Sequence, residues 1–411
     1  MTSATARPSP ADREARTRRL DLLAYVVGLA FGLSILVASG YADWSAEAIG
    51  RSDFAKFWAG PRAVLLGLDP FDARTWQATA VQLGATAVNW PNYGYFGWTI
   101  ILLFPFALVP LEVAFPLWTI GGLAAAAFAI GTLLRRSLPG HPVAHTLIGM
   151  TLFASQPARL TVLLGQWGFV LCAALAAIIV WTRGDRPARA GIAAIALLAK
   201  PQLFLLAAPA LALWAWRSGQ RRAIAVALTA GGTLAALSVA LLPQWPAAWL
   251  RDIPSRALSA EPQTTTLASA LYGIVGQPGT WLALAVIGGC AVAALRFDPR
   301  GDAWLAAWLP LSLIAAPYVW SYDQTVLVIP LVLGGGVVAH RSRRLATGVI
   351  VTGTVTLLVV STALAVVAAR RNLESYSAFI PLLVFAVLVA ALWPVRRGCS
   401  DGPRDRSTRT V

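Results

Sequence analysis

Charged residues are scarce in this sequence. Asp, Glu, Lys and Arg make up 12% of its 411 residues, whereas hydrophobic residues make up 57%. A soluble domain carries roughly 25% charged residues. This shortage, together with a mean hydropathy of +0.66, excludes a small soluble domain held by a single anchor. We therefore predict an all-α, polytopic integral membrane protein.

Cysteine and histidine are equally rare, with three of each. Their spacing suits neither a disulfide framework nor a metal-ligand cluster. No G-x-x-x-x-G-K-[ST] loop and no H-E-x-x-H motif occurs, which excludes an ATP-driven pump domain and a membrane zinc protease. The apolar segments hold few ionisable groups, which argues against proton-coupled or voltage-sensing roles. The residues in question are Cys172, Cys290, Cys399, His141, His145 and His340.

Basic residues are plentiful, and the net charge is +15, yet only two of the 33 are lysines, Lys56 and Lys200. The arginines gather at the termini and in short loops between apolar runs. This pattern marks the cytoplasmic side of a membrane protein and suits anionic lipid headgroups, so we expect membrane lipids and no nucleic acid as partners. Residues 1–19 precede an apolar run without a cleavage site, which indicates a retained first span with a cytoplasmic N-terminus.

About twelve apolar segments of membrane-spanning character follow one another. We expect a basic N-terminus at 1–19, a transmembrane domain at 20–396 and a cytoplasmic tail at 397–411. Two loops, 41–96 and 243–279, fall on the outer side, and each is expected to contain a short interfacial helix, at 53–67 and around 245–258. The segments lie near 21–40, 97–110, 112–134, 143–158, 160–181, 190–216, 223–242, 280–295, 303–320, 322–339, 345–368 and 377–395.

The middle of this topology has two solutions. Strict alternation places the basic turns at 135–136 and 183–189 outside, which the positive-inside bias disfavours. If 97–110 is re-entrant and 190–216 is split at Lys200–Pro201, those turns lie inside. Both solutions leave the two long loops and the junction 318–323 on the outer side.

The first outer loop contains Asp53 and Lys56 in the segment Ser52–Trp58, directly after the first span. An acid at this position lies between lipid and water, where it could accept a proton from a hydroxyl group beside a lipid-borne donor. Ser52 and Asp53 also suit the N-cap of a helix. The following Gly67–Pro70, with Asp69, has the composition of a turn.

Three further segments place polar groups beside apolar runs. Gln166, in Gly165–Gly168, could bind a substrate hydroxyl or a neighbouring helix. Lys200 lies inside an apolar segment and precedes a helix-breaking proline, so it could bind a phosphate or extend to a helix end. The segments Asn89–Tyr95 and Ala316–Gln324 suit aromatic belts or hairpins, and equally suit sugar binding.

Taken in order, these segments resemble glycosyltransferase family 87, a group of polyprenol-phosphate-dependent mannosyl- and arabinosyltransferases in the GT-C superfamily. The resemblance runs from about residue 50 to about residue 335. It departs from the family at Trp90–Tyr95, where Tyr-x-Pro-Pro is common, at Ala316, where serine is common, and at Tyr322–Asp323. The matching segments are Asp53-Phe54, Gly67–Phe71, Trp90–Tyr93, Gly165-Gln166, Lys200-Pro201 and Ala316–Asp323.

The resemblance implies a GT-C-like fold and a reaction at the outer face of the cytoplasmic membrane. The donor would be a polyprenyl-phosphate sugar (mannose, another hexose or arabinofuranose) and the acceptor a hydroxyl of a glycolipid or glycan. Asp53 would be the general base of a single inverting displacement, and Lys200, with Lys56 or Arg62, would stabilise the departing phosphate. No D-x-D triplet occurs, so we expect no metal and no cofactor. The remaining substrate-binding candidates are Asp69, Tyr93, Gln166, Trp320, Tyr322 and Asp323.

Two rival functions fit the same composition. A transporter or flippase for a lipid-linked glycan would have a similar number of spans, although transporters often show repeated halves, which this sequence lacks. A non-catalytic partner in envelope biosynthesis is the other rival.

Overall fold

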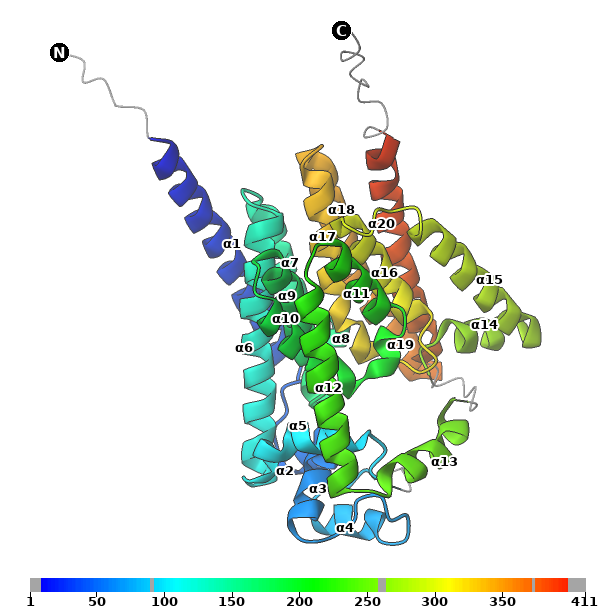
Figure 1. The fold of residues 1–411 in the computed structure, drawn as a ribbon. Coiled ribbons are helices and arrows are strands. Elements are labelled where there is room, and N and C mark those ends of the chain that lie inside the picture. The colour runs from blue at the N-terminus through cyan, green and yellow to red at the C-terminus, as the bar shows by residue number, and fades with distance from the viewer. Residues whose placement is uncertain (1–8, 89–91, 258–263, 372–373, 398–411) are drawn as a thin grey trace, which may run out of the picture.

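The computed structural model describes residues 9–88, 92–257, 264–371 and 374–397, and within these ranges all regular structure is helical. The prediction of an all-α protein is confirmed. Helix α1 (Pro10–Ala38) begins, and helix α20 (Phe379–Arg397) ends, at the same end of the bundle, which we name the terminal end (Figure 1). The short helices of the first long loop lie at the opposite end, which we name the distal end.

Seven helical stretches in the described part of the chain are long and apolar enough to cross a membrane, or eight if one bent pair counts as a span. The polytopic character is therefore confirmed, while the count of twelve stays a prediction. The bent pair is α7 (Pro142–Ala154) with α8 (Gln156–Leu164), at an angle of 41°. The seven stretches are α1, α6 (Leu111–Ser137), α12 (Arg221–Leu241), α15 (Gln277–Ala294), η3 with α17 (Ser321–Ala339), α18 to α19 (Arg343–Arg370) and η5 with α20 (Glu374–Trp393).

The remaining helices are shorter. Four of them are apolar: α5 (Gly97–Ala107), α9 (Gly168–Arg183), α10 with η1 (Pro187–Ala199) and α16 (Asp302–Ile314). The others are α2 (Ala46–Arg51), α3 (Asp53–Leu65), α4 (Trp76–Gln82), η2 (Pro201–Phe204), α11 (Ala207–Arg217), α13 (Trp245–Ala257) and α14 (Leu267–Val275).

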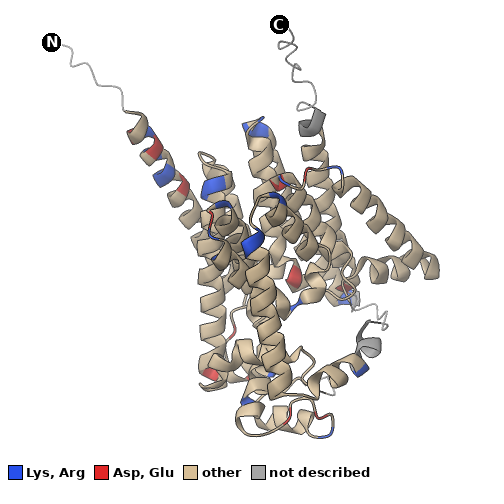
Figure 2. Ribbon diagram, viewed as in Figure 1, with Lys and Arg blue, Asp and Glu red and all other residues tan. Residues whose placement is uncertain are grey.

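The basic turns gather at the terminal end, as Figure 2 shows. Arg136 at the end of α6 donates to the carbonyl of Val180 near the end of α9, at 2.8 Å. Arg183 pairs with Asp302 at the start of α16, at 2.5 Å. Since these contacts tie the turns after α6 and α9 to one another and to the α15–α16 turn, all of them lie on one side of the bundle.

This arrangement agrees with the topology in which 97–110 is re-entrant and 190–216 is split at Lys200–Pro201. Helix α5 lies at the distal end with α2, α3 and α4 and does not reach the terminal end (Figure 1). The apolar stretch 190–216 is broken at Lys200, whose backbone (φ −139°, ψ 66°) leaves the helical region. Proline disfavours the helical conformation in the residue before it, which explains the break at Lys200. The basic turns and both described ends of the chain thus share one side.

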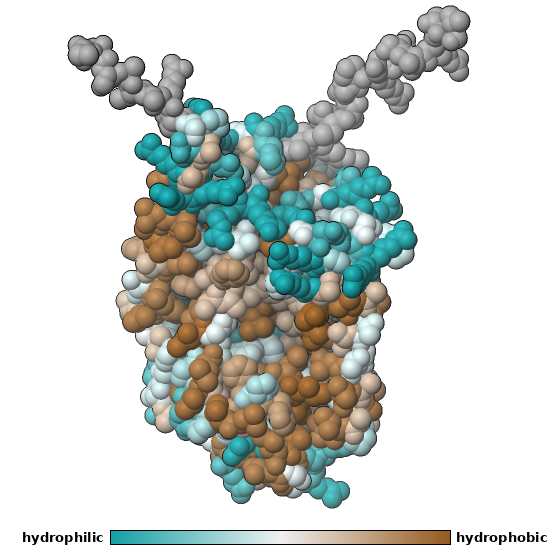
Figure 3. Space-filling model, turned by 60° about the vertical axis from the view of Figure 1, so that its left-hand side comes forward, coloured by the Kyte–Doolittle hydropathy of each residue, from teal (hydrophilic) through white to brown (hydrophobic). Residues whose placement is uncertain are grey.

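Apolar side chains cover much of the surface below the hydrophilic terminal end (Figure 3). Helix α1 is longer than the predicted first span, because the basic segment from Pro10 continues into it without interruption. The predicted N-terminal segment 1–19 and tail 397–411 fall partly outside the described residues.

The first long loop folds into helices that pack inside the protein. Ser52 caps α3 by accepting a hydrogen bond from the backbone N–H of Ala55, at 3.2 Å, and this sets Asp53 in the first turn. The predicted helix over 53–67 therefore forms. Phe54 and Phe57 are fully buried against α5, α6 and Trp167 rather than facing lipid. The second predicted helix forms as α13.

Candidate active site

Asp53 lies in the first turn of α3, held on both carboxylate oxygens. Lys56, one turn later on the same helix, approaches Oδ1 with its ammonium at 2.6 Å. The side-chain amide of Gln166 donates to Oδ2, also at 2.6 Å. The side chain of Asp53 keeps 22% of its surface exposed. The carboxylate is thus fixed in orientation and still accessible to a substrate.

Gln166 reaches Asp53 from the turn between α8 and α9. Gly165 ends α8 in a left-handed conformation (φ 61°), and a Cβ atom there would lie 2.5 Å from Cβ of Phe54. Glycine therefore allows this turn to approach α3 closely. The Gly-Gln segment selected from the sequence has a physical reason: the glycine permits the contact and the glutamine makes it.

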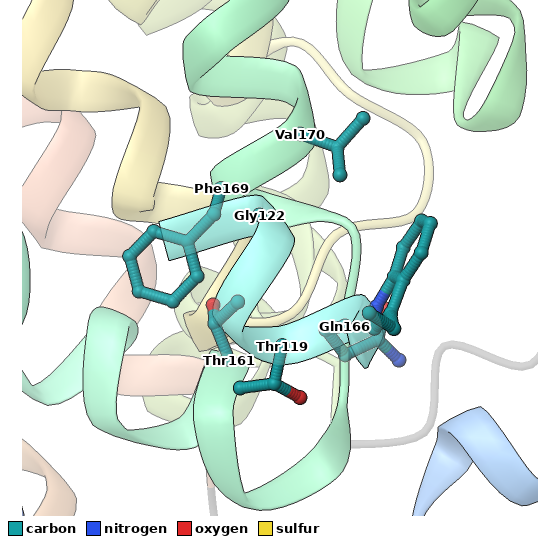
Figure 4. A pocket seen from close by; sticks show the side chains of 7 residues that line it. Thr119, Gly122, Thr161, Gln166, Phe169 and Val170 are labelled. Carbon is teal, nitrogen blue, oxygen red and sulfur yellow. The ribbon is translucent and has the colours of Figure 1, made fainter. Parts of the chain in front are cut away.

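The same turn lines a narrow space against α6 that is too small for a water molecule (Figure 4). Gln166 Oε1 and Thr119 Oγ1 line this space, and neither has a hydrogen-bond partner among the described residues. Among the described residues, the side chain of Gln166 therefore makes its hydrogen bond to Asp53. This supports an orienting role for Gln166 rather than direct sugar binding.

A second carboxylate–lysine pair lies deeper. Lys200, at the break between η1 and η2, approaches Oδ1 of Asp323 at 2.6 Å, and both side chains are almost completely buried (4% and 2% exposed). The other oxygen of Asp323 accepts the backbone N–H of Trp320 at 3.0 Å. The Lys200 ammonium also lies 4.4 Å from the centroid of the Tyr322 ring. Two segments 123 residues apart are joined here.

The two pairs are neighbours, and both act electrostatically on Tyr95. Burial raises the pKa of Tyr95 well above its usual range, and the negative charges of Asp53 and Asp323 raise it further. The phenol is therefore neutral at physiological pH and can act as a hydrogen-bond donor. Its ring packs edge-on against Phe57, one turn from Asp53, at 4.7 Å. The hydroxyl of Thr161 on α8 donates to the backbone carbonyl of Tyr322 at 3.3 Å. This hydrogen bond joins α8 to the segment that contains Asp323.

The late aromatic segment forms one side of this neighbourhood. Trp320 is partly exposed and donates its indole N–H to the hydroxyl of Tyr318 at 2.7 Å. Its ring stacks on that of Tyr322, with 6.5 Å between the ring centroids. A partly exposed indole beside the Lys200–Asp323 pair suits the apolar face of a sugar ring. The structure thus brings together Asp53, Lys56, Gln166, Lys200, Trp320, Tyr322 and Asp323.

Three predicted site residues make other contacts. Arg62 donates to the carbonyl of Ala107 at 3.2 Å, at the end of α5. Asp69 accepts the backbone N–H of Phe71 at 2.8 Å in a tight turn, which agrees with the turn predicted there. Tyr93 is 2% exposed and packs against Phe71 and Trp76. Trp90 and Pro91 lie outside the described residues.

Two residues of this neighbourhood were not selected from the sequence. Tyr95 belongs to the predicted aromatic segment, but its two tyrosines, Tyr93 and Tyr95, are alike in sequence. Glu374, at the start of η5, accepts a hydrogen bond from Ser321 at 3.2 Å. No local pattern distinguishes Glu374, because its contact depends on a segment 53 residues away. Among the described residues, no group of three or more His, Cys, Asp or Glu side chains forms a cluster that could hold a metal.

Comparison with known proteins gives one family. The family model described as glycosyltransferase family 87 matches residues 97–320, more than half of the chain. Among solved structures, ArnT from Cupriavidus metallidurans, crystallised with undecaprenyl phosphate, shares 14% sequence identity with a TM-score of 0.43, covering 91% of this chain and 78% of that one. This similarity is too low to transfer any property to the chain. No curated protein sequence matches significantly.

Proposed function

The chain belongs to glycosyltransferase family 87, and we propose that it transfers a sugar from a polyprenyl-phosphate donor to a hydroxyl group of a glycolipid or glycan. The observation that carries this proposal is the carboxylate of Asp53, held at 2.6 Å by both Lys56 and Gln166 while remaining partly exposed. Family membership favours an enzyme over the transporter and the assembly partner.

Asp53 is the proposed general base. Among the described residues each oxygen of its carboxylate has one side-chain partner, which leaves a further lone pair on each for the proton of an acceptor hydroxyl. The hydroxyl oxygen attacks the anomeric carbon as its proton moves to Asp53. The bond from that carbon to the phosphate oxygen breaks, and the phosphate leaves with both electrons. One displacement of this kind inverts the anomeric configuration.

The departing phosphate needs positive charge more than a proton. Lys56 is closest to Asp53, and Lys200 lies beside the second carboxylate. The ammonium of Lys200 has three donor hydrogens, of which Asp323 takes one, so a phosphate oxygen can take another. Fixed charges in a site of low dielectric stabilise developing negative charge strongly, because they need no reorganisation during the reaction. The guanidinium of Arg62 binds the end of α5, so we assign this role to the two lysines.

We place this reaction at the outer face of the cytoplasmic membrane. The support is charge distribution: the basic turns lie at the terminal end, which the positive-inside bias assigns to the cytoplasm, and the loop with Asp53 is distal. The sugar is mannose, another hexose or arabinofuranose, as the family resemblance suggests.

The test is a transfer assay with the purified protein in lipid vesicles. Radiolabelled polyprenyl-phosphate mannose, and separately the arabinofuranose equivalent, are supplied with a membrane glycolipid extract. Transfer of label from one donor to lipid or glycan, lost in Asp53→Asn, supports the proposal. Transfer that continues unchanged in Asp53→Asn rejects the assigned base, and label that only crosses the bilayer without a new glycosidic bond supports the flippase.

A further inference from the structure

An apolar groove runs along α1 on the side that faces α6. Its volume is about 320 Å³, and every residue that lines it is apolar. Phe153 of α7 and Val162 of α8 are buried residues of its lining, while the α1 and α6 side chains of the groove are mostly exposed on the surface of the bundle. These exposed residues include Leu33, Val37, Ile120 and Ala124. A groove of this composition between two spanning helices suits a hydrocarbon chain.

The groove lies at the distal end of α1. It extends from Leu33 to the loop residues Ala42 and Trp44. Helix α1 ends at Ala38, so its part from position 33 spans about 7.5 Å, and the non-helical residues beyond it carry the groove further toward the distal end. One leaflet contributes about 15 Å of hydrocarbon. A lipid chain lying in the groove would therefore have its headgroup near Tyr41, at the distal end of α1.

A cation lies at that end of the groove. Arg159 of α8 is one helical turn before Val162, and its guanidinium lies 5.1 Å from the centroid of the Tyr41 ring. One of its terminal nitrogens donates to Thr362 at 2.9 Å. Its Nε is buried and has no hydrogen-bond partner among the described residues. No carboxylate pairs with Arg159 in the described part of the chain.

We propose that this groove binds one hydrocarbon chain of an anionic phospholipid, with the headgroup phosphate at Arg159. The charge of the arginine favours an anionic headgroup over a zwitterionic one, and its planar donor set matches phosphate oxygens. The site does not depend on the proposed transferase reaction.

The position of Arg159 separates this lipid from the sugar donor. Thr161, two residues later on α8, donates to the backbone carbonyl of Tyr322, whose ring lies beside the Lys200 ammonium. Two residues correspond to about 200° around a helix, so Arg159 extends from nearly the opposite face. A phosphate held by Arg159 would therefore be on the far side of α8 from Asp53. This geometry selects a resident phospholipid over the polyprenyl donor.

The test uses photo-crosslinking in phosphatidylcholine vesicles that contain a small fraction of phosphatidylglycerol with a diazirine on its acyl chain. After irradiation, peptides carrying the label are identified by mass spectrometry. We expect label on the α1 and α6 segments around residues 33–37 and 120–124. Arg159→Gln should lower this label about tenfold at limiting lipid, because a charged hydrogen-bond donor is lost. Ala124→Trp should lower it by filling the groove.

Ala285→Trp is the matched control, since Ala285 is an exposed alanine on the spanning helix α15 and its replacement should leave the label unchanged. Thermal unfolding of each variant, measured in the same vesicles, shows whether the fold is kept, and Ala124→Trp keeps the test valid if Arg159→Gln unfolds. Unlabelled phosphatidylglycerol should compete with the label better than phosphatidylcholine does. Equal competition by phosphatidylcholine, stronger competition by a polyprenyl phosphate, or unchanged labelling in both groove variants would overturn the proposal.

Discussion

The protein contains two carboxylate–lysine pairs with the same N–O distance, 2.6 Å, in very different surroundings. Asp53 and Lys56 are one turn apart on α3 and are partly exposed. Asp323 and Lys200 come from segments 123 residues apart and are almost completely buried. Distance alone therefore does not separate a carboxylate that is open to a substrate from one that is enclosed by the fold.

Burial is the difference that matters. A partly exposed pair within one helix contributes little stability, because water already solvates both charges. Its carboxylate, however, is open to a substrate. A buried pair costs more to desolvate than it returns, unless its geometry and additional hydrogen bonds compensate. Asp323 has such compensation from the Trp320 backbone, so this pair fixes where the broken helix meets the late aromatic segment.

The largest expected effect is on turnover. Asp53→Asn should lower sugar transfer by about 10²- to 10⁴-fold, the usual contribution of a general base. The amide keeps the size of the side chain and can still contact Gln166, so binding of the donor should change much less. Initial rates with the labelled donor measure this effect. Asp43→Asn, an exposed acid in the same loop, should retain full activity. Equal rates for both variants would remove Asp53 from the mechanism.

The next effect is on stability. Lys200→Met should lower the free energy of unfolding by about 3–5 kcal/mol, because it leaves the Asp323 charge buried without its cation. Replacing both partners, in Lys200→Met with Asp323→Leu, should restore much of this loss. Denaturant unfolding in detergent micelles measures each value. If the single variant is as stable as the double variant, Asp323 is solvated and the contrast between the two pairs is lost.

A smaller effect is expected at the partly exposed pair. Lys56→Met should lower the free energy of unfolding by about 1 kcal/mol, less than Lys200→Met does, because water still reaches both charges. Transfer should fall more than stability does, since the variant removes positive charge next to the reacting carboxylate. The same unfolding and rate measurements apply. A stability loss as large as that of Lys200→Met contradicts the distinction by burial.

The smallest effect is expected at Asp69. Asp69→Asn keeps an oxygen that can accept the N–H of Phe71, so stability should change by less than about 0.5 kcal/mol. Transfer should remain within about threefold of the unmodified protein, because the structure gives Asp69 a turn contact rather than one to the ion pairs. A rate loss comparable to that of Asp53→Asn would return Asp69 to the proposed site.

The sequence predicts local features of this site well. Ser52 and Asp53 suit a helix start, and the helix begins there. Lys200 before proline suggests a break, and the break occurs. Tyr93 and Tyr95 show where such reasoning stops. They are two residues apart in one aromatic segment, yet Tyr93 packs against Trp76 while Tyr95 packs against Phe57, within reach of the charges of Asp53 and Asp323. That difference depends on which surfaces the segment meets after folding.

Composition and periodicity by themselves determine that the chain is helical and crosses a membrane several times, because long apolar segments with few charges are stable as helices inside the bilayer. Basic turns also indicate one common side. Only the tertiary structure decides that α5 stays at the distal end and that residues 190–216 turn back at Lys200. It alone joins Lys200 to Asp323 and Gln166 to Asp53, because contacts between distant segments depend on how whole helices pack, and no local pattern encodes that.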